Sequence, residues 1–262
     1  MSVMKFFRIW KRSSEMALEH VMAYKTAFFL LLLSLFLGDI LIPVISVVIY
    51  QVSSGIPGWN LAEFVLFQGT LIIVIGLWHT FFASLLGETI SAVEEGIFDR
   101  VLLKPFPSLA FLTAYSFDPD GLAEVAAGII IVGWALVKMH FFNSTIIIYA
   151  LILILAVLFE YSLTIIASSM AFTFVRTWRL FELINIAERF SRYPLDVYNK
   201  SMRFFLTFIV PAGIAAYYPA SVLMGKQTVF VVFKIIIPIL LFFVFSLWLW
   251  NISIKKYNSA GG

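Results

Sequence analysis

Six segments of this chain are apolar over lengths close to the roughly 20 residues that an α-helix needs to cross the hydrocarbon layer of a bilayer. No hydrophilic stretch between them reaches the roughly 50 residues of a small soluble domain. The sequence therefore predicts an all-α, polytopic membrane protein that forms a single domain over residues 1–262. The expected transmembrane helices cover residues 26–50, 61–86, 121–137, 145–175, 204–223 and 228–250.

The composition agrees with a membrane protein. Hydrophobic residues make up 62% of the chain and charged residues 13%, whereas about 25% of a typical soluble domain is charged. Such an apolar excess is too large to bury in one soluble core. The chain has no cysteine, which excludes disulfides and thiolate metal sites.

The fifth apolar segment is unusual because it contains Pro211 and Pro219. A proline inside a helix removes a backbone hydrogen bond and kinks or ends the helix, so one straight helix is not expected. Irregular backbone at membrane depth must be buried in protein or line water. We therefore expect a broken or re-entrant segment near the fifth span, and it includes Tyr217 and Tyr218.

Residues 5–25 have the pattern of an amphipathic helix rather than of a span. Charged residues recur at helical spacing along one face, and apolar residues occupy the other. Such a helix is expected to lie in the membrane interface with its basic face toward headgroups and water. A helix on a water-exposed protein surface is the alternative. The charged residues are Lys5, Arg8, Arg12, Glu15 and Glu19.

The distribution of lysine and arginine predicts the orientation in the membrane. With six spans, both termini and residues 87–120 and 176–203 share one side, which carries fifteen basic residues against three on the other. Cytoplasmic loops of membrane proteins are enriched in lysine and arginine. We therefore expect a multi-pass protein of the cell membrane with both termini in the cytoplasm.

Sequence motifs for catalysis or nucleotide binding are absent. The chain contains no GxxxxGK followed by Ser or Thr, no HExxH and no GxSxG, which are the patterns of phosphate-binding loops, zinc proteases and serine hydrolases. Its three histidines fall in separate segments. The basic residues lie along membrane boundaries, where topology explains them. We expect a protein that is not an enzyme, holds no cofactor itself and binds no nucleic acid.

Three ionisable residues inside the expected spans are candidates for function, namely Asp39, His79 and Glu160. Ionisable groups are costly in lipid and mark functional sites by default. His79 and Glu160 lie ~27 Å and ~24 Å along their helices from the same side of the membrane. A contact between them would be either a proton-responsive pair or a structural hydrogen bond, and the structural interpretation is favoured.

Residues 94–107 concentrate charge and proline between two very apolar regions. Gly96 is expected to break a helix, and Pro105 to stop the short helix that follows. Ile97, Val101 and Leu102 would share an apolar stripe. From pattern alone the segment is either a solvated connection or a docking surface. The residues singled out are Glu94, Glu95, Gly96, Asp99, Arg100, Leu102, Lys104 and Pro105.

Four stretches of the chain, taken in order, carry a family resemblance. They are EEGIFDRVLLKPFP, SSMAFTFVRTWRLFELIN, ERFSRYPLDVY and TFIVPAGIAAYYPASVLMG. Together they resemble the permease subunits of type-2 (ABC-2) ATP-binding-cassette exporters over nearly the whole chain. In a prokaryotic branch known only as a domain of unknown function, a G-x-x-D-x-x-L-x-x-P element follows the second span. Here that element is Gly96, Asp99, Leu102 and Pro105.

The resemblance implies a half-transporter. Two six-span permeases, identical or homologous, would lie side by side in the lipid bilayer, each docked on one of two ABC ATPase subunits. The coupling helix would be residues 94–107, and ATP and Mg²⁺ would bind to the ATPases. The segment around Pro211 and Pro219 would match the family's short re-entrant helices on the outer side. The substrate would be hydrophobic or amphiphilic and would move outward.

Two other functions stay open at this level. A stand-alone, proton-coupled secondary transporter or channel would use Asp39, His79 and Glu160. A membrane enzyme acting on lipids has the least support, because the sequence shows no nucleophile or metal-binding set.

Overall fold

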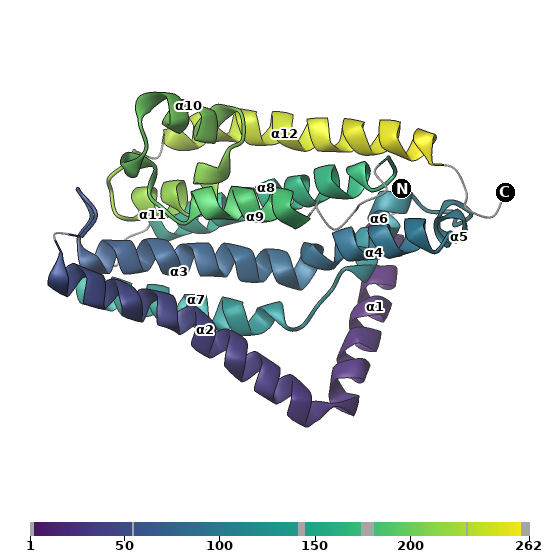
Figure 1. Cartoon of the computed structure of the whole chain (residues 1–262), viewed down its shortest axis with the longest axis horizontal. Helices are drawn as coiled ribbons and strands as arrows, with labels where there is room; N and C mark the ends of the chain where they lie inside the picture. The colour runs from purple at the N-terminus through teal and green to yellow at the C-terminus, as the bar shows by residue number, and fades with distance from the viewer. Residues whose placement is uncertain (1–2, 54, 141–144, 174–180, 229, 258–262) are drawn as a thin grey trace.

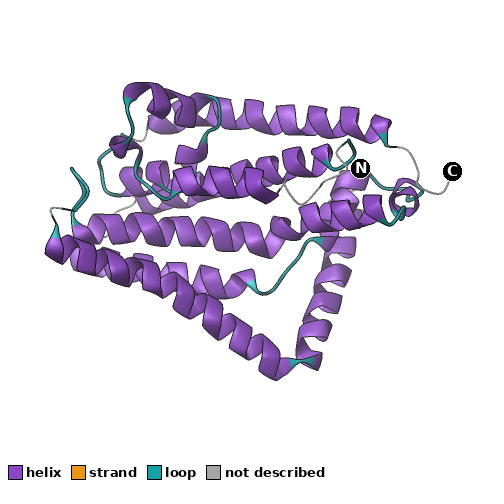
Figure 2. Cartoon of the chain, viewed as in Figure 1, coloured by secondary structure: helices purple, strands orange, loops and turns teal. Residues whose placement is uncertain are grey.

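The computed structural model describes residues 3–53, 55–140, 145–173, 181–228 and 230–257 (Figure 1). Every regular element in this part of the chain is a helix, as the sequence predicts (Figure 2). In chain order the helices are α1 (Val3–Ala23), α2 (Lys25–Val52), α3 (Leu61–Trp78), the π-helical turn η1 (His79–Ala83), α4 (Ser84–Glu94), α5 (Phe98–Leu102), α6 (Ser108–Tyr115), α7 (Gly121–Met139), α8 (Thr145–Met170), α9 (Phe181–Ser191), η3 (Leu195–Val197), α10 (Lys200–Phe208), η4 (Ala212–Ile214), α11 (Tyr217–Leu223), α12 (Val231–Ser253) and η5 (Ile254–Lys256).

Five helices of the described chain are long and apolar enough to cross a membrane. They are α2, the continuous helix from α3 to α4, α7, α8 and α12. These match the first four predicted spans and the sixth, although α8 ends at Met170 instead of residue 175. In the most apolar window of each helix, 72% of the residues are buried in α3–α4 but only 6% in α2. The long central helix therefore forms the core of the bundle, and α2 lies at its edge.

The bundle has two distinct ends (Figure 1). We call the end that holds α5 and α6 the α5 end, and the opposite end, which holds α10 and α11, the α11 end. Residues 87–120 were predicted as a loop at the α5 end, but α4 continues to Glu94 and α6 occupies Ser108–Tyr115. The helix that ends before Gly96 was expected, and α4 confirms it; α6 was not predicted.

The predicted fifth span, residues 204–223, does not cross the bundle. The chain bends by 85° between α10 and the stretch from η4 to α11. Asp196, just before α10, accepts a hydrogen bond from Trp59 Nε1 at 3.1 Å, and Lys226, just after α11, donates to the carbonyl of Gly58. Both ends of the bent segment therefore lie beside the loop that follows α2. The segment is re-entrant at the α11 end, which the two prolines had suggested.

The chain instead returns across the bundle between α8 and α10. Phe172 packs on Phe98 at the α5 end with ring centroids 4.8 Å apart, whereas Ser191 donates to the carbonyl of Ala212 at the α11 end. Between them α9 packs against α8. The prediction of a single loop over residues 176–203 at the α5 end was therefore wrong. Hydropathy alone cannot distinguish an amphipathic helix that packs inside a bundle from one that faces water. Residues 174–180 lie outside the described part.

The N-terminal segment is helical, as the prediction for residues 5–25 requires. α1 meets α2 at a steep angle (Figure 1) and packs against α6. The ring of Trp10 lies 5.9 Å from that of Phe117, and the side chains of Lys5, Arg8 and Arg12 are exposed. The apolar face of α1 thus covers the turn that precedes α7. Its position in the membrane interface stays a prediction.

Candidate functional site

The segment between α4 and α6 is a short helix held between two backbone breaks. α4 ends at Glu94, and Gly96 has φ 67°, a conformation that glycine adopts at little cost. After this change of backbone direction α5 begins at Phe98, and it ends at Leu102, three residues before Pro105. Both predicted breaks are confirmed. Because α5 has only five residues, it cannot be stable alone and needs tertiary contacts.

Those contacts come from Phe98 and Val101, whose side chains are buried. The ring of Phe98 lies 4.8 Å from that of Phe172 after α8 and 5.1 Å from that of Tyr257 after α12. The prediction that Val101 shares one apolar stripe with Ile97 and Leu102 was therefore wrong, because Val101 is buried while the other two are exposed. Phe98 was missed because sequence pattern alone cannot show which face of a five-residue helix finds a core.

The outer face of α5 combines apolar and charged side chains. Ile97, Leu102 and Leu103 are exposed, and Leu103 reaches an exposed fraction of 84%. Glu94, Glu95, Arg100, Lys104 and Pro105 surround them and are exposed too, while Asp99 is half-buried. Lys104 Nζ lies 5.5 Å from the ring centre of Phe111. An apolar surface with charged residues at its border is typical of a docking site for another protein.

A second group of predicted residues meets where α3 and α7 pack closely together. Cβ atoms added to Gly76, Gly121 or Gly128 would have their nearest contact, with the opposite helix or its turns, at 2.6–2.7 Å. Small residues allow membrane helices to approach this closely. We call Gly69, Gly76, Gly121 and Gly128 the glycine seam. The seam brings the first turns of α7 against the end of α3.

This packing places a carboxylate beside His79. Nδ1 of His79 lies 2.6 Å from Oε2 of Glu124 in α7. From the sequence, a contact of His79 was considered with Glu160, which is buried on α8, and Glu124 was not among the candidates. Near the start of a span, Glu124 resembles an ordinary boundary residue. The close packing of α7 on α3 at the glycine seam fixes the orientation of α7 about its own axis. In that orientation the side chain of Glu124 points inward.

The turn before α7 is also tied to the π-helical turn that contains His79. The Asp118 N–H donates to the carbonyl of Thr80 at 2.9 Å, and the Asp120 N–H donates to Asp118 Oδ1 at 3.0 Å. Burial raises the pKa of Asp120, and the carboxylates of Asp118 and Glu124 raise it further. π-helical turns occur often at functional sites. Here the turn and its partners hold the start of α7 in place.

Asp39 lies near this pair across a pocket of about 440 Å³. Its walls come from α2, α3, the π-helical turn, α7 and the chain after α9. The structure therefore brings Asp39 and His79 into one pocket, which we call the α2–α3 pocket. Within it, Ser46 Oγ donates to Gln68 Oε1 at 3.0 Å. In the described residues no three His, Asp or Glu side chains are arranged to hold a metal ion.

The re-entrant segment is held by polar contacts of its tyrosines. Tyr217 OH donates to Asp196 Oδ1 at 3.0 Å, and Tyr218 OH lies 2.9 Å from Thr207 Oγ1. α10 ends at Phe208, three residues before Pro211, and η4 begins directly after that proline, whereas Pro219 lies in the first turn of α11. A proline there costs no helical hydrogen bond, so naming Pro219 as a second break was wrong.

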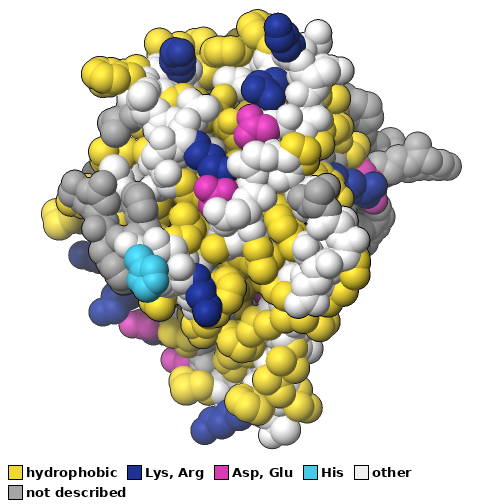
Figure 3. Space-filling model, turned by 90° about the vertical axis from the view of Figure 1, so that its left-hand side faces the viewer, with side chains coloured by type: hydrophobic (Ala, Val, Ile, Leu, Met, Phe, Trp, Pro, Cys, Tyr) yellow, Lys and Arg dark blue, Asp and Glu magenta, His cyan; other side chains and the backbone are white. Residues whose placement is uncertain are grey.

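The α11 end also carries paired charges. Lys226 lies 2.8 Å from Glu63, and Arg203 lies 3.5 Å from Asp196. Figure 3 shows this end in space-filling form, with basic and acidic side chains next to one another within a largely uncharged surface. Two of the basic side chains at this end are therefore paired with carboxylates.

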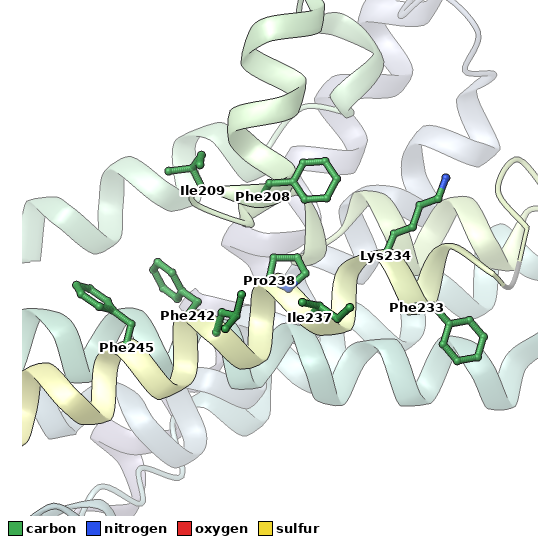
Figure 4. A pocket seen from close by; sticks show the side chains of 9 residues that line it. Phe208, Ile209, Phe233, Lys234, Ile237, Pro238, Phe242 and Phe245 are labelled. Carbon is green, nitrogen blue, oxygen red and sulfur yellow. The ribbon is translucent and has the colours of Figure 1, made fainter.

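An apolar groove of about 710 Å³ lies between α10 and α12. Phe208 and Ile209 face Pro238 and Phe242 across it (Figure 4). Among the described residues that line it, Lys234 alone is charged. The groove thus offers apolar contacts and a positive charge, the reverse of the acidic α2–α3 pocket.

A family comparison decides between the functions left open by this geometry. Residues 28–261 match the family described as ABC-2 family transporter protein. The chain belongs to the ABC-2 transporter family. As an ABC-2 permease it is a multi-pass membrane component of a transporter and is not itself catalytic, and its family associates with an ABC ATPase. A stand-alone, proton-coupled transporter is not favoured. Comparisons with curated proteins and with solved structures find no match.

Proposed function

We propose that this ABC-2 permease couples to a separate ATPase through residues 94–107 and exports a hydrophobic or amphiphilic substrate. The observation that supports this most is the exposed outer face of α5. Ile97, Leu102 and Leu103 are exposed on a helix whose other side is fixed by Phe98. An exposed apolar surface of this kind marks an interaction site.

The anchoring of α5 suits it to transmit movement. Phe98 contacts residues that follow both α8 and α12, so a displacement of α5 acts on two spans at once. When ATP and Mg²⁺ bind, closure of the ATPases would move the docked helix and shift the permease between two states. Charged residues around the apolar face would set the orientation of docking. We propose two ATPase copies and a second permease, identical or homologous.

The proposed orientation places the α5 end and both termini in the cytoplasm. The fold places Arg192, Lys200 and Arg203 at the α11 end. Among the described residues, and leaving aside Arg189 within α9, nine basic residues then belong to the α5 end and the N-terminal helix, against six at the α11 end. This asymmetry still has the direction that the positive-inside rule requires. The membrane would be the cell membrane, with the re-entrant segment on its outer side.

Crosslinking from single cysteines tests the coupling, because the chain has none of its own. Leu103→Cys is expected to crosslink to the co-expressed ABC ATPase. Val52→Cys is a matched control, because Val52 is 80% exposed and Leu103 84%, and Val52 lies at the α11 end. Mass spectrometry would identify the crosslinked peptides. Crosslinks at both positions, or at neither, would contradict the coupling assignment.

A transport assay distinguishes this proposal from a stand-alone carrier. Liposomes that contain the permease and its ATPase are expected to move substrate only with ATP. Movement of substrate by the permease alone, driven by a proton gradient, would contradict the proposed function.

A further inference from the structure

The α2–α3 pocket is amphiphilic, with one polar end. Asp39, His79 and Glu124 lie together at this end, whereas Ile45 and Leu71 belong to the apolar walls. Its volume of about 440 Å³ is within the usual range of small-molecule sites, about 300–1,000 Å³. It can hold a molecule with an apolar body and one polar group.

The polar end has more hydrogen-bond acceptors than donors. Oδ2 of Asp39 is buried and has no hydrogen-bond partner in the described structure. Pro43 lies one turn later in α2 and lacks the N–H that would otherwise bond to the Asp39 carbonyl. Oε2 of Glu124 is shared with His79. A ligand that adds positive charge would complement this end of the pocket.

Neither of the basic residues that line the pocket, Arg192 and His79, forms a salt bridge with Asp39 in the described structure. Arg192 belongs to the lining but its side chain is exposed. Among the described residues no ion pair joins Arg192 to Asp39 or to Glu124, and the short contact of His79 is with Glu124. Asp39 is half-buried, and a carboxylate at membrane depth that lacks a cation is costly. The binding of a cation would offset that cost.

We propose that the α2–α3 pocket binds a lipophilic monovalent cation, with its charge beside Asp39 and its apolar body against α2 and α3. This inference rests on the proposed function, because it names the class of substrate that the permease would export. The groove of Figure 4 does not fit such a ligand, since the charged side chain in its described lining is Lys234, a cation.

Binding of tetraphenylphosphonium to the full chain in lipid nanodiscs, without ATPase, tests the proposal. Tetraphenylborate has nearly the same size and shape but the opposite charge. Equilibrium dialysis against empty nanodiscs corrects for partition into lipid. We expect saturable binding of tetraphenylphosphonium at one site per chain, and at least about tenfold weaker binding of tetraphenylborate.

Variants of Asp39 identify the site. Asp39→Asn is expected to weaken binding of tetraphenylphosphonium by at least about tenfold, whereas Asp39→Glu keeps the charge and most of the affinity. Glu19→Gln is the control, because Glu19 is an exposed acid on α1 outside the pocket. Ile45→Trp fills the apolar wall without changing the charge, and it is expected to reduce binding as well.

Three outcomes would overturn the assignment. They are no saturable binding by the wild-type chain, equal binding by Asp39→Asn, and tetraphenylborate binding that is equally strong and equally reduced by Ile45→Trp. The last outcome would show an apolar site without charge selection. None of them affects crosslinking of Leu103→Cys to the ATPase, so failure of this inference is distinguishable from failure of the proposed function. Size-exclusion chromatography confirms that each variant is folded.

Discussion

Neighbouring side chains of α5 have opposite environments, although all of them are apolar. Phe98 and Val101 are buried, whereas Leu102 and Leu103 are exposed. At the scale of single residues, one set therefore fixes the helix to the bundle and the other is available to a partner. The two roles can be separated by substitution.

Phe98→Ala is expected to lower the stability of the permease by about 3 kcal/mol or more, because it leaves a cavity between α5 and residues after α8 and α12. The measurement is the thermal unfolding midpoint in detergent. Leu103→Ala removes only exposed surface, so its stability should stay within about 0.5 kcal/mol of wild type. It should nevertheless reduce co-purification of the ATPase. An unstable Leu103→Ala variant would argue against this division of roles.

At the scale of elements, the pairing of α3 with α7 controls the polar end of the α2–α3 pocket. The glycine seam brings the backbones together, and the Asp118 N–H donates to Thr80 O at 2.9 Å where η1 meets the turn before α7. The position of Glu124 beside His79 depends on both contacts. The pocket is therefore a consequence of how two helices pack, not of a local motif.

Gly128→Ala is expected to destabilise the protein by about 1–3 kcal/mol. Its Cβ would lie 2.7 Å from Ile73 Cγ1 and 2.8 Å from the backbone nitrogen of Ile73, so α3 and α7 must move apart. Gly133→Ala on the same helix is the control, because its Cβ would meet nothing within 4 Å. Alanine there should be neutral or slightly stabilising. Thermal unfolding of both variants measures the difference, and equal midpoints would contradict close packing at the seam.

At the scale of the whole molecule, the re-entrant segment decides which loops share a side of the membrane. Asp196 contacts both Trp59 and Tyr217, so the chain between α9 and α12 stays at the α11 end. Five uninterrupted helices and one amphipathic return through α9 then carry the chain across the bundle. In the described part of the chain, the return toward the α11 end thus lies earlier in the sequence than the predicted fifth span.

Cysteine labelling measures this topology. Lys200→Cys and Val52→Cys are expected to react with a membrane-impermeant maleimide from the same side of the membrane, and Leu103→Cys only from the opposite side. If residues 204–223 formed a span, Lys200→Cys would react together with Leu103→Cys. Intact and permeabilised cells provide the two conditions. That second pattern would rule out the re-entrant segment.

Much of the local structure was predictable from the sequence. Bilayer thickness and backbone hydrogen bonding determine where apolar helices of sufficient length form, so the bounds of α2, α7 and α12 were predicted to within three residues. Gly96 and Pro105 marked the limits of α5 because backbone rules act locally. Phe98 and Glu124 were missed, since burial of a side chain depends on neighbours that are distant in the sequence.

The sequence by itself determined the helical class, most of the spans and the short helix after the second one, because these follow from hydropathy and backbone chemistry within about 20 residues. Only the tertiary structure showed that Glu124 contacts His79, that Asp39 shares their pocket and that residues 204–223 turn back. Those features depend on how each helix is rotated against the next, which close packing at the glycine seam and polar contacts at Asp196 decide.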